Sequence, residues 1–247
     1  MIPQPDSLRV QNEQLQRELG QARAELEDFT YSVAHDLRAS LRHVSAYVQI
    51  VREDLGEQAS PAIAGHLDRV HQAARHMGLQ IDALSELSRL TRVEMQLANV
   101  DPGVLLQEVC ASLTSSLAGR AVVWQLAPDF PPLRCDATLL RQLWTHLLSN
   151  ALKFSAGRAV AEIKVGWQVQ GDGLCALTVS DNGVGFNPAH GHKLFHVFQR
   201  LHGAREFEGI GVGLALTRKI AQRHGGSAWA NGAPDAGCSV SVTFPLA

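Results

Sequence analysis

The chain has 247 residues, enough for one large domain or two small ones. Its apolar fraction of 45% and charged fraction of 19% are typical of a globular protein, and a net charge of −2 argues against general attraction to nucleic acid or acidic membranes. No apolar run reaches the roughly 18 residues of a membrane span, and the polar N-terminus does not resemble a signal peptide. The four cysteines form no Cys-x-x-Cys pair, so we expect reduced thiols in a cytoplasmic protein.

The first part of the sequence, about residues 7–55, predicts one long helix. Its apolar side chains are spaced alternately four and three residues apart, the pattern of a coiled-coil seam. The seam consists of Leu15, Leu19, Ala22, Leu26, Phe29 and Val33. A turn over residues 56–61 follows, in which Ser60 is expected to cap the next helix and Pro61 to occupy its first position.

A second helix is predicted from about residue 61 to 97, with the same spacing of apolar residues. A hairpin of two such helices cannot bury so wide a seam alone, so we expect a homodimer whose two hairpins form a four-helix bundle. The alternative is that the seam packs on the rest of the same chain. Residues 99–103 then interrupt the pattern and are predicted to be a linker.

The remainder of the chain predicts an α/β sandwich on a mostly antiparallel or mixed sheet. Three segments have helical patterns, namely residues 103–117, 136–154 and 211–225. Five segments have strand patterns, namely residues 121–126, 161–170, 174–180, 227–230 and 239–244.

A first glycine cluster follows one of these strands, in the sequence Asp181-Asn182-Gly183-Val184-Gly185. A carboxylate at Asp181 can accept a hydrogen bond from the exocyclic amine of adenine, and Gly183 and Gly185 would let the base approach the backbone. Taken alone, the motif is more often just a turn. It lacks the acidic ligands of an EF-hand loop.

A second cluster, Gly209, Gly211 and Gly213, precedes a helix that continues with Leu214. Backbone amides at a helix N-terminus make an anion site, which suits phosphates. The Gly-Lys-Ser/Thr of a Walker A loop is absent. A Rossmann fingerprint would need a glycine where Leu214 stands and a strand immediately before the cluster, and neither is found.

Two polar residues on a predicted helix could complete a nucleotide site. An amide oxygen such as that of Asn150 can ligate Mg²⁺ without adding charge, and Lys153 would lie on a neighbouring face near the phosphates. Without the glycine clusters, both would be interpreted as exposed helix residues.

Histidines are numerous, and one of them lies in a distinctive context. His35 is on the first long helix beside Asp36, and a neutral imidazole accepts a phosphoryl group well when a carboxylate orients it. His190, His192 and His196 could suggest a metal site, but their spacing in a loop favours solvated residues.

These residues together resemble the catalytic core of a sensor histidine kinase of two-component signalling, in its bacteriophytochrome-like branch, from about residue 28 to 247. Residues 29–38 resemble the H-box, 147–154 the N-box, 181–186 the G1 box, 193–202 the F-box and 208–216 the G2 box. The resemblance implies the phosphoacceptor, the Mg²⁺ ligand, the adenine reader and phosphate contacts, in that order: His35, Asn150, Asp181, and Arg200 with Lys193.

The resemblance also implies an architecture and partners. It divides the chain into a signalling coiled coil (1–28), a dimerisation and phosphotransfer domain (29–98) and a GHKL-type Bergerat domain that binds ATP and Mg²⁺ (99–247). The implied partner is a response-regulator receiver domain. A sensor domain upstream or on another protein stays open, as does the question whether Met1 is a natural start.

Four positions depart from the family pattern. His146 replaces a second N-box asparagine, and Ile210 replaces a frequent threonine in the G2 box. Ser40 stands where the H-box usually has a proline, so the helix should be straighter or differently hinged. Ala39 replaces the Thr or Asn tied to dephosphorylation of the partner.

Three functions are therefore considered. The first is an ATP-dependent protein-histidine kinase that phosphorylates His35 and passes the group to an aspartate of a response regulator. The second is a kinase-like dimeric scaffold with little ATP turnover, which His146 and Ile210 favour. The third, a gyrase- or chaperone-type ATPase, is disfavoured by the H-box on a helical hairpin.

Overall fold

The structure is a computed structural model that describes residues 5–56, 60–115, 117, 119–203 and 206–247. It divides into two compact units, Met1–Arg92 and Val93–Ala247, and each is described by itself. None of the described helices is long and apolar enough to cross a membrane.

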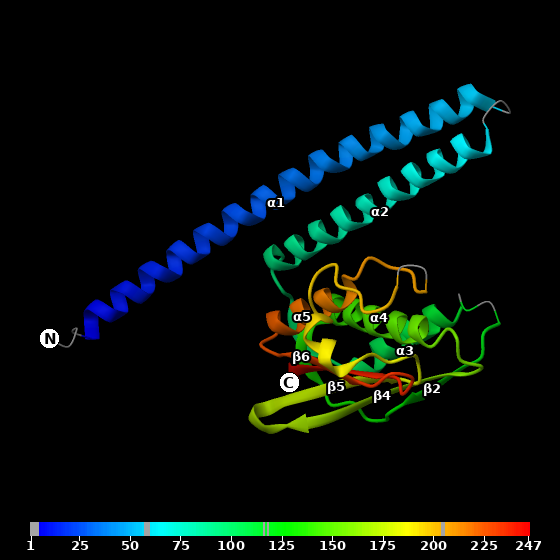
Figure 1. The fold of residues 1–247 in the computed structure, drawn as a ribbon. Helices are drawn as coiled ribbons and strands as arrows, with labels where there is room; N and C mark the ends of the chain where they lie inside the picture. Colours follow the sequence, from blue (N-terminus) through cyan, green and yellow to red (C-terminus); the bar gives the residue numbers. More distant parts are fainter. Residues whose placement is uncertain (1–4, 57–59, 116, 118, 204–205) are drawn as a thin grey trace. The chain divides into compact units, whose positions relative to one another are not determined.

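The first unit is a hairpin of two long helices, α1 (Pro5–Leu55) and α2 (Pro61–Arg92), which lie side by side (Figure 1). Ion pairs tie them in an antiparallel register: Arg92 to Asp28 at 2.6 Å, Arg38 to Asp82 at 2.8 Å, and Arg52 to Asp68. Exposed pairs of this kind contribute roughly 0–1 kcal/mol each, so they set the register more than the stability.

The hairpin buries only part of its apolar surface. Small and branched residues form its inner seam, namely Ala34, Val48, Ala74 and Ile81. By contrast, the predicted coiled-coil residues Leu15, Leu19, Leu26 and Phe29 remain between 52% and 66% exposed. One hairpin therefore leaves most of the predicted seam without a partner among the described residues.

Helix α2 ends at Arg92, five residues before the end expected from the sequence. The reason is a short strand, β1 (Leu97–Val100), which was not predicted from the sequence. Its residues were predicted to lie partly in the helix and partly in a linker. It pairs antiparallel with β3 (Leu133–Asp136), and Asp136 Oδ2 accepts a hydrogen bond from the Gln96 N–H at 2.9 Å. Sheet pairing thus outcompetes continuation of the helix.

The second unit contains a mixed sheet of five strands in the order β2-β4-β5-β7-β6. Its strands are β2 (Val122–Leu126), β4 (Ala161–Gln170), β5 (Leu174–Asp181), β6 (Ala228–Gly232) and β7 (Cys238–Pro245). Only the β2–β4 pair is parallel. The predicted α/β sandwich on a mixed sheet is confirmed.

Three helices cover one face of this sheet (Figure 1). They are α3 (Pro102–Thr114), α4 (Ala137–Phe154) and α5 (Gly213–Arg223). The other face is open, and β4 alternates accordingly between buried Ala161, Ile163, Val165 and exposed Glu162 and Lys164. Short 3₁₀ helices η2 (Gly171–Gly173) and η3 (Pro188–Lys193) lie in the connections.

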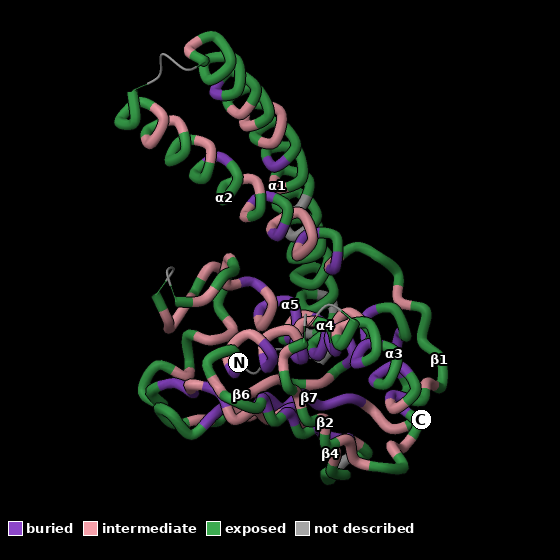
Figure 2. The backbone as a smooth tube through the Cα atoms, turned by 90° about the vertical axis from the view of Figure 1, so that its right-hand side faces the viewer, coloured by how far each residue is buried: buried purple, intermediate pink, exposed green. Residues whose placement is uncertain are grey.

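Helix α4 forms the centre of the core, where buried positions concentrate (Figure 2). Leu140, Leu143, Trp144 and Leu148 are fully buried. The helix begins because Asp136 accepts hydrogen bonds from the N–H groups of residues 138 and 139, which is an N-cap. The same helix carries Asn150 and Lys153 of the predicted N-box, so the core fixes their position.

Candidate functional site

A cavity of about 290 Å³ lies between α4, the end of β5, residues 194–202 and 207–212, and the first turn of α5. It brings together predicted nucleotide-binding residues from four separate motifs: Asn150, Lys153, Asp181, Gly185, Arg200, Gly209, Gly211, Gly213 and Leu214. Two other predicted residues do not line it. Gly183 is buried beside the Phe154 carbonyl, and Lys193 is exposed at the end of η3.

Asp181 ends β5 and supplies a carboxylate to the cavity wall. One oxygen accepts a hydrogen bond from the Gly183 N–H at 2.8 Å. Burial raises the pKa of Asp181 to about 6, although hydrogen bonds from the backbone of Gly183 and Cys238 act in the opposite direction. At neutral pH the group is mostly ionised, and its two oxygens retain capacity to accept from a ligand amine.

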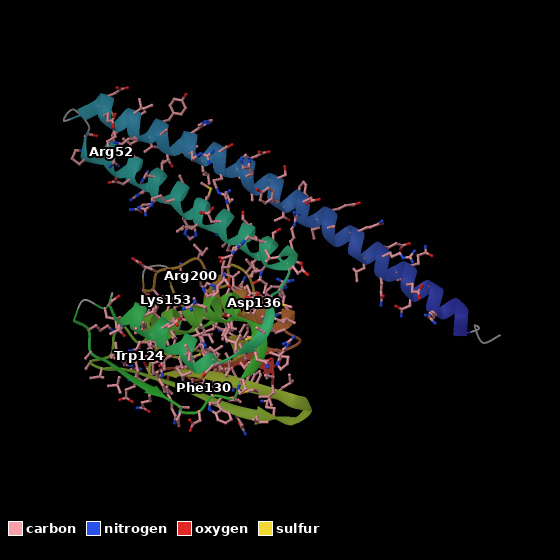
Figure 3. All side chains as sticks on the ribbon, turned by 180° about the vertical axis from the view of Figure 1, so that it is seen from behind. Arg52, Trp124, Phe130, Asp136, Lys153 and Arg200 are labelled. Atoms are coloured by element: carbon pink, nitrogen blue, oxygen red, sulfur yellow. The ribbon has the colours of Figure 1, made fainter. Side chains whose placement is uncertain are left out.

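Part of the cavity wall is basic. Lys153 and Arg200 lie close together there (Figure 3), and the pKa of Lys153 is lowered by burial and then by the charge of Arg200. Neither side chain forms an ion pair within the described part of the chain. Arg200 instead donates to the carbonyls of Gly203, at 3.4 Å, and Phe207. Two neighbouring cations with no ion-pair partner among the described residues make this part of the wall suitable for a polyanion.

The first turn of α5 also faces the cavity. Its N-cap residue Val212 offers no side-chain hydrogen bond, so the N–H groups of Gly213 and Leu214 have no capping side chain. Free amides at a helix N-terminus, together with the helix dipole, attract phosphate. The turn thus adds anion donors beside Lys153 and Arg200.

Asn150 lies next to this turn, since a Cβ atom at Gly213 would be 3.7 Å from Asn150 Nδ2 and 3.6 Å from His146 Nδ1. The amide has no hydrogen-bond partner among the described residues, and an uncharged oxygen ligand is chemically suited to Mg²⁺ near phosphates. His146 Nε2 is buried and unpartnered within the same described residues. Burial also lowers the pKa of His146, so this ring is neutral at pH 7.

The turn that carries Gly185 is held tightly from outside the cavity. Gly185 has a φ of +62°, and a Cβ atom there would lie 1.9 Å from the Ala233 carbonyl oxygen, so only glycine fits. Arg158 donates hydrogen bonds to the carbonyls of Asn182, Gly183 and Asp235 at 2.7–3.0 Å. The sequence reading missed Arg158, because three backbone acceptors leave no signal in side-chain patterns.

An aromatic cluster forms another part of the wall and was also not singled out from the sequence. Phe154, His202 and Phe207 pack with ring centroids 5.0–5.5 Å apart. All three line the cavity, and the Lys153 ammonium lies 4.5 Å from the Phe154 centroid. Such a surface suits a flat apolar ligand such as a purine base.

His35 lies on α1, in the helical unit, and is exposed. Its Nδ1 is 3.2 Å from Asp36 Oδ1, so a proton on Nδ1 would leave Nε2 with a free lone pair. The helix continues without a break past Ser40, whose hydroxyl donates to the Asp36 carbonyl at 3.1 Å. Ala39 lies one turn after His35 and offers only a methyl group.

The predicted loop histidines do not assemble a metal site in the part of the chain that is described. His190, His192 and His196 are all exposed, the first two on η3. No group of three potential ligands from His, Cys, Asp and Glu was found among the described residues.

Comparisons with known proteins fit this geometry. Residues 135–247 match the family described as "Histidine kinase-, DNA gyrase B-, and HSP90-like ATPase". Over 97% of this chain, the sequence is 32% identical to the methanogenesis regulatory histidine kinase FilI of Methanothrix harundinacea, and over 94% it is 28% identical to the phytochrome-like protein Cph1 of Synechocystis. The chain is thus similar to a histidine kinase over nearly its whole length. It spans 27% and 31% of the length of these two relatives.

Solved histidine kinases share the fold of this chain. The match to the structure of full-length ShkA in complex with AMPPNP has a TM-score of 0.63 and 22% identity, and it covers 89% of this chain and 46% of the ShkA chain. The match to the Acinetobacter baumannii histidine kinase AdeS has a TM-score of 0.58 and 17% identity, and it covers 86% of this chain and 98% of the AdeS chain. The predicted combination of a helical hairpin with an ATPase-type domain is confirmed.

Proposed function

We propose that this chain is an ATP-dependent protein-histidine kinase that autophosphorylates His35 and passes the phosphoryl group to an aspartate of a response-regulator receiver domain. The observation that supports it most is the cavity of the second unit. There, one cavity is lined by a partly buried carboxylate, by two cations that have no ion-pair partner among the described residues, and by a helix N-terminus that no side chain caps. The carboxylate suits the amine of adenine, and the cations and helix amides suit a triphosphate.

The proposed binding roles follow from the chemistry of these groups. Asp181 accepts from the adenine amine, and Phe154 offers an apolar ring to the base. Lys153, Arg200 and the amides of Gly213 and its neighbours stabilise the phosphate oxygens. Asn150 would hold Mg²⁺, which supplies neutralising charge to the phosphates when it is bound.

The chemical step requires an unprotonated ring nitrogen on His35. We place the proton on Nδ1, where Asp36 accepts it, so Nε2 attacks the γ-phosphorus. The N–P bond forms as the bond from the γ-phosphorus to the bridging oxygen breaks, and ADP leaves with that electron pair. Asp36 stabilises the positive charge that develops on the imidazole, and the receiver aspartate then accepts the phosphoryl group.

The exposed seam of the hairpin supports the proposal of a homodimer. Leu15, Leu19, Leu26 and Phe29 are more than half exposed in one chain. Pairing two hairpins into a four-helix bundle would bury such side chains, each worth roughly 1.5–3 kcal/mol when fully buried. Input from a sensor domain, upstream or on a partner, belongs to the same proposal.

The proposal is tested by incubating the protein with Mg²⁺ and ATP labelled on the γ-phosphate. Acid-labile label on the chain is expected, and His35→Gln should abolish it while leaving nucleotide affinity unchanged. Matched His43→Gln, on the same helix, should label like the parent. Full labelling of His35→Gln would overturn the assignment, and release of free phosphate alone would indicate an ATPase instead.

A second candidate function is a dimeric scaffold that binds a regulator with little ATP turnover. The observation that favours it is His146, a largely buried imidazole beside Asn150 with no described partner for Nε2. Its bulk next to the proposed metal ligand could slow phosphoryl transfer without preventing nucleotide binding. Nucleotide binding with no label on the chain and no release of labelled inorganic phosphate would support this candidate.

A further inference from the structure

We propose that His202 is a positioning residue that fastens the F-box segment (residues 193–202) to the turn at Gly185, and thereby slows nucleotide release. The inference rests on the proposed binding of ATP. It assigns a role to a side chain that neither the sequence motifs nor the chemistry above requires.

The link is one hydrogen bond. His202 Nε2 lies 2.9 Å from the carbonyl oxygen of Gly185. A carbonyl can only accept, so Nε2 carries the proton and donates.

The acceptor is a rigid anchor. Gly185 is buried, its φ is +62°, and a Cβ atom there would lie 1.9 Å from the Ala233 carbonyl oxygen, so the turn packs closely against this carbonyl. The neighbouring Val184 donates to the Phe154 carbonyl at 3.2 Å and accepts from the Asp235 N–H at 2.8 Å. Breaking the bond from His202 would therefore free the F-box segment and leave the turn in place.

The ring of His202 is oriented by its neighbours. Its centroid lies 5.5 Å from that of Phe154 on α4 and 5.3 Å from that of Phe207. These contacts restrict rotation of the imidazole and keep Nε2 directed at the carbonyl, which reduces the entropy lost when the bond forms.

The same segment is also bonded to the residues that precede α5. The Phe198 N–H donates to the Gly211 carbonyl at 2.9 Å, next to the start of α5. Arg200 lies between these two ties and faces the cavity. The tie at Phe198 is made by backbone atoms and survives side-chain substitution, whereas the tie at Gly185 depends on one side chain. His202 thus holds the segment that carries Arg200, in addition to the hydrogen bonds that Arg200 donates to the carbonyls of Gly203 and Phe207.

Three variants separate the bond from the ring. His202→Phe keeps an aromatic ring and removes the donor, His202→Gln keeps an N–H donor without the ring, and His202→Ala removes both. His196→Phe is the matched control, because His196 is exposed in the same segment. Each protein is loaded with Mg²⁺ and a fluorescent ATP analogue, and release is followed after a chase with unlabelled ATP.

A neutral hydrogen bond of typical strength corresponds to about 2- to 13-fold in a rate or equilibrium constant. We expect His202→Phe to release nucleotide faster by that factor, His202→Ala at least as fast, and His202→Gln to recover part of the loss, with His196→Phe unchanged. Equal release from His202→Phe and the parent would overturn the inference, as would a His202→Gln variant no better than His202→Ala.

A second measurement needs no nucleotide. Trypsin cleavage after Lys193 and Arg200 in the nucleotide-free protein should be faster in His202→Phe than in the parent and in His196→Phe. Unchanged cleavage would overturn the proposal that His202 fastens the F-box segment to the turn at Gly185. If the parent binds no nucleotide and His202→Phe is still cleaved faster, the proposed function and the effect on release are overturned, while the fastening role of His202 stands.

Discussion

Replacing Asp181 with asparagine should stabilise the ATPase-type domain at neutral pH while weakening its nucleotide binding. Burial raises the pKa of Asp181 from 3.8 to about 6. Each unit of pKa difference corresponds to about 1.4 kcal/mol. Keeping this carboxylate ionised in the folded state therefore costs at most about 3 kcal/mol relative to the unfolded chain.

The direction of the pH dependence follows from that shift. Between about pH 4 and pH 6, the folded state keeps a proton that the unfolded chain has released, so the free energy of unfolding falls as the pH rises through this window. Asparagine does not titrate, and its amide oxygen can still accept from the Gly183 N–H. Asp181→Asn should therefore be more stable than the parent at pH 7.5, by up to about 3 kcal/mol, and the gap should close near pH 4.

Tryptophan fluorescence during denaturant unfolding measures this difference selectively. All four tryptophans lie in the unit Val93–Ala247, at positions 124, 144, 167 and 229. Histidines that titrate in the same range are common to both proteins, so their effects cancel in the difference. A gap that does not change with pH, or a variant less stable than the parent at pH 7.5, would refute the reasoning.

The same variant should bind ATP more weakly. Loss of a charge-assisted hydrogen bond costs roughly 1.5–3 kcal/mol, which corresponds to about 10- to 150-fold in affinity. The affinity of the parent should also fall as the pH drops below about 6, where Asp181 protonates, whereas that of the variant should stay flat. Calorimetric titration at several pH values measures both. Unchanged affinity in the variant would mean that the adenine lies elsewhere.

Three further predictions concern the rest of the chain. Met77, 45% exposed on one hairpin, should lie in the dimer seam, so Met77→Glu should shift the chain from dimer to monomer in light scattering. Ala39→Thr should raise dephosphorylation of a phosphorylated regulator and leave labelling of His35 nearly unchanged, because the hydroxyl can orient an attacking water; rapid dephosphorylation by the parent would contradict this. His224 accepts from the Asp136 N–H at 3.0 Å and burial lowers its pKa, so the unfolded chain takes up a proton below about pH 6.5 that the folded chain refuses. Acidification through that range should therefore lower tryptophan-monitored stability more in the parent than in His224→Gln, and equal slopes would contradict the assignment.

The long elements could be predicted because their signal is repeated. The two helices of the hairpin carry many turns of apolar spacing, and the five strands of the main sheet alternate or run apolar between turns. Strand β1 could not be found this way, since its four residues precede the turn-like Asp101 and Pro102 and its partner β3 lies more than thirty residues away. Asp101 is in fact the N-cap of α3, accepting from the N–H groups of residues 103 and 104.

The site was predictable to the extent that its chemistry depends on side chains in fixed local spacing. Asp181 with its glycines, and the glycines before α5, form compact motifs whose geometry is local. Arg158 and His202 act on backbone carbonyls of segments far along the chain. Any residue presents such a carbonyl, so the sequence of the acceptor carries no trace of the contact, and only the fold brings donor and acceptor together.

Helix α4 connects the two kinds of information. Leu143 and Leu148 on this helix are fully buried, while Asn150, Lys153 and Phe154 on the same helix line the cavity. Because adjacent residues on one helix cannot move independently, the packing that buries the first set fixes the second to within the tolerance of the core. The apolar periodicity that identifies the helix in the sequence is thus also the reason that Asn150, Lys153 and Phe154 reach the cavity that Asp181 of β5 and Arg200 also line.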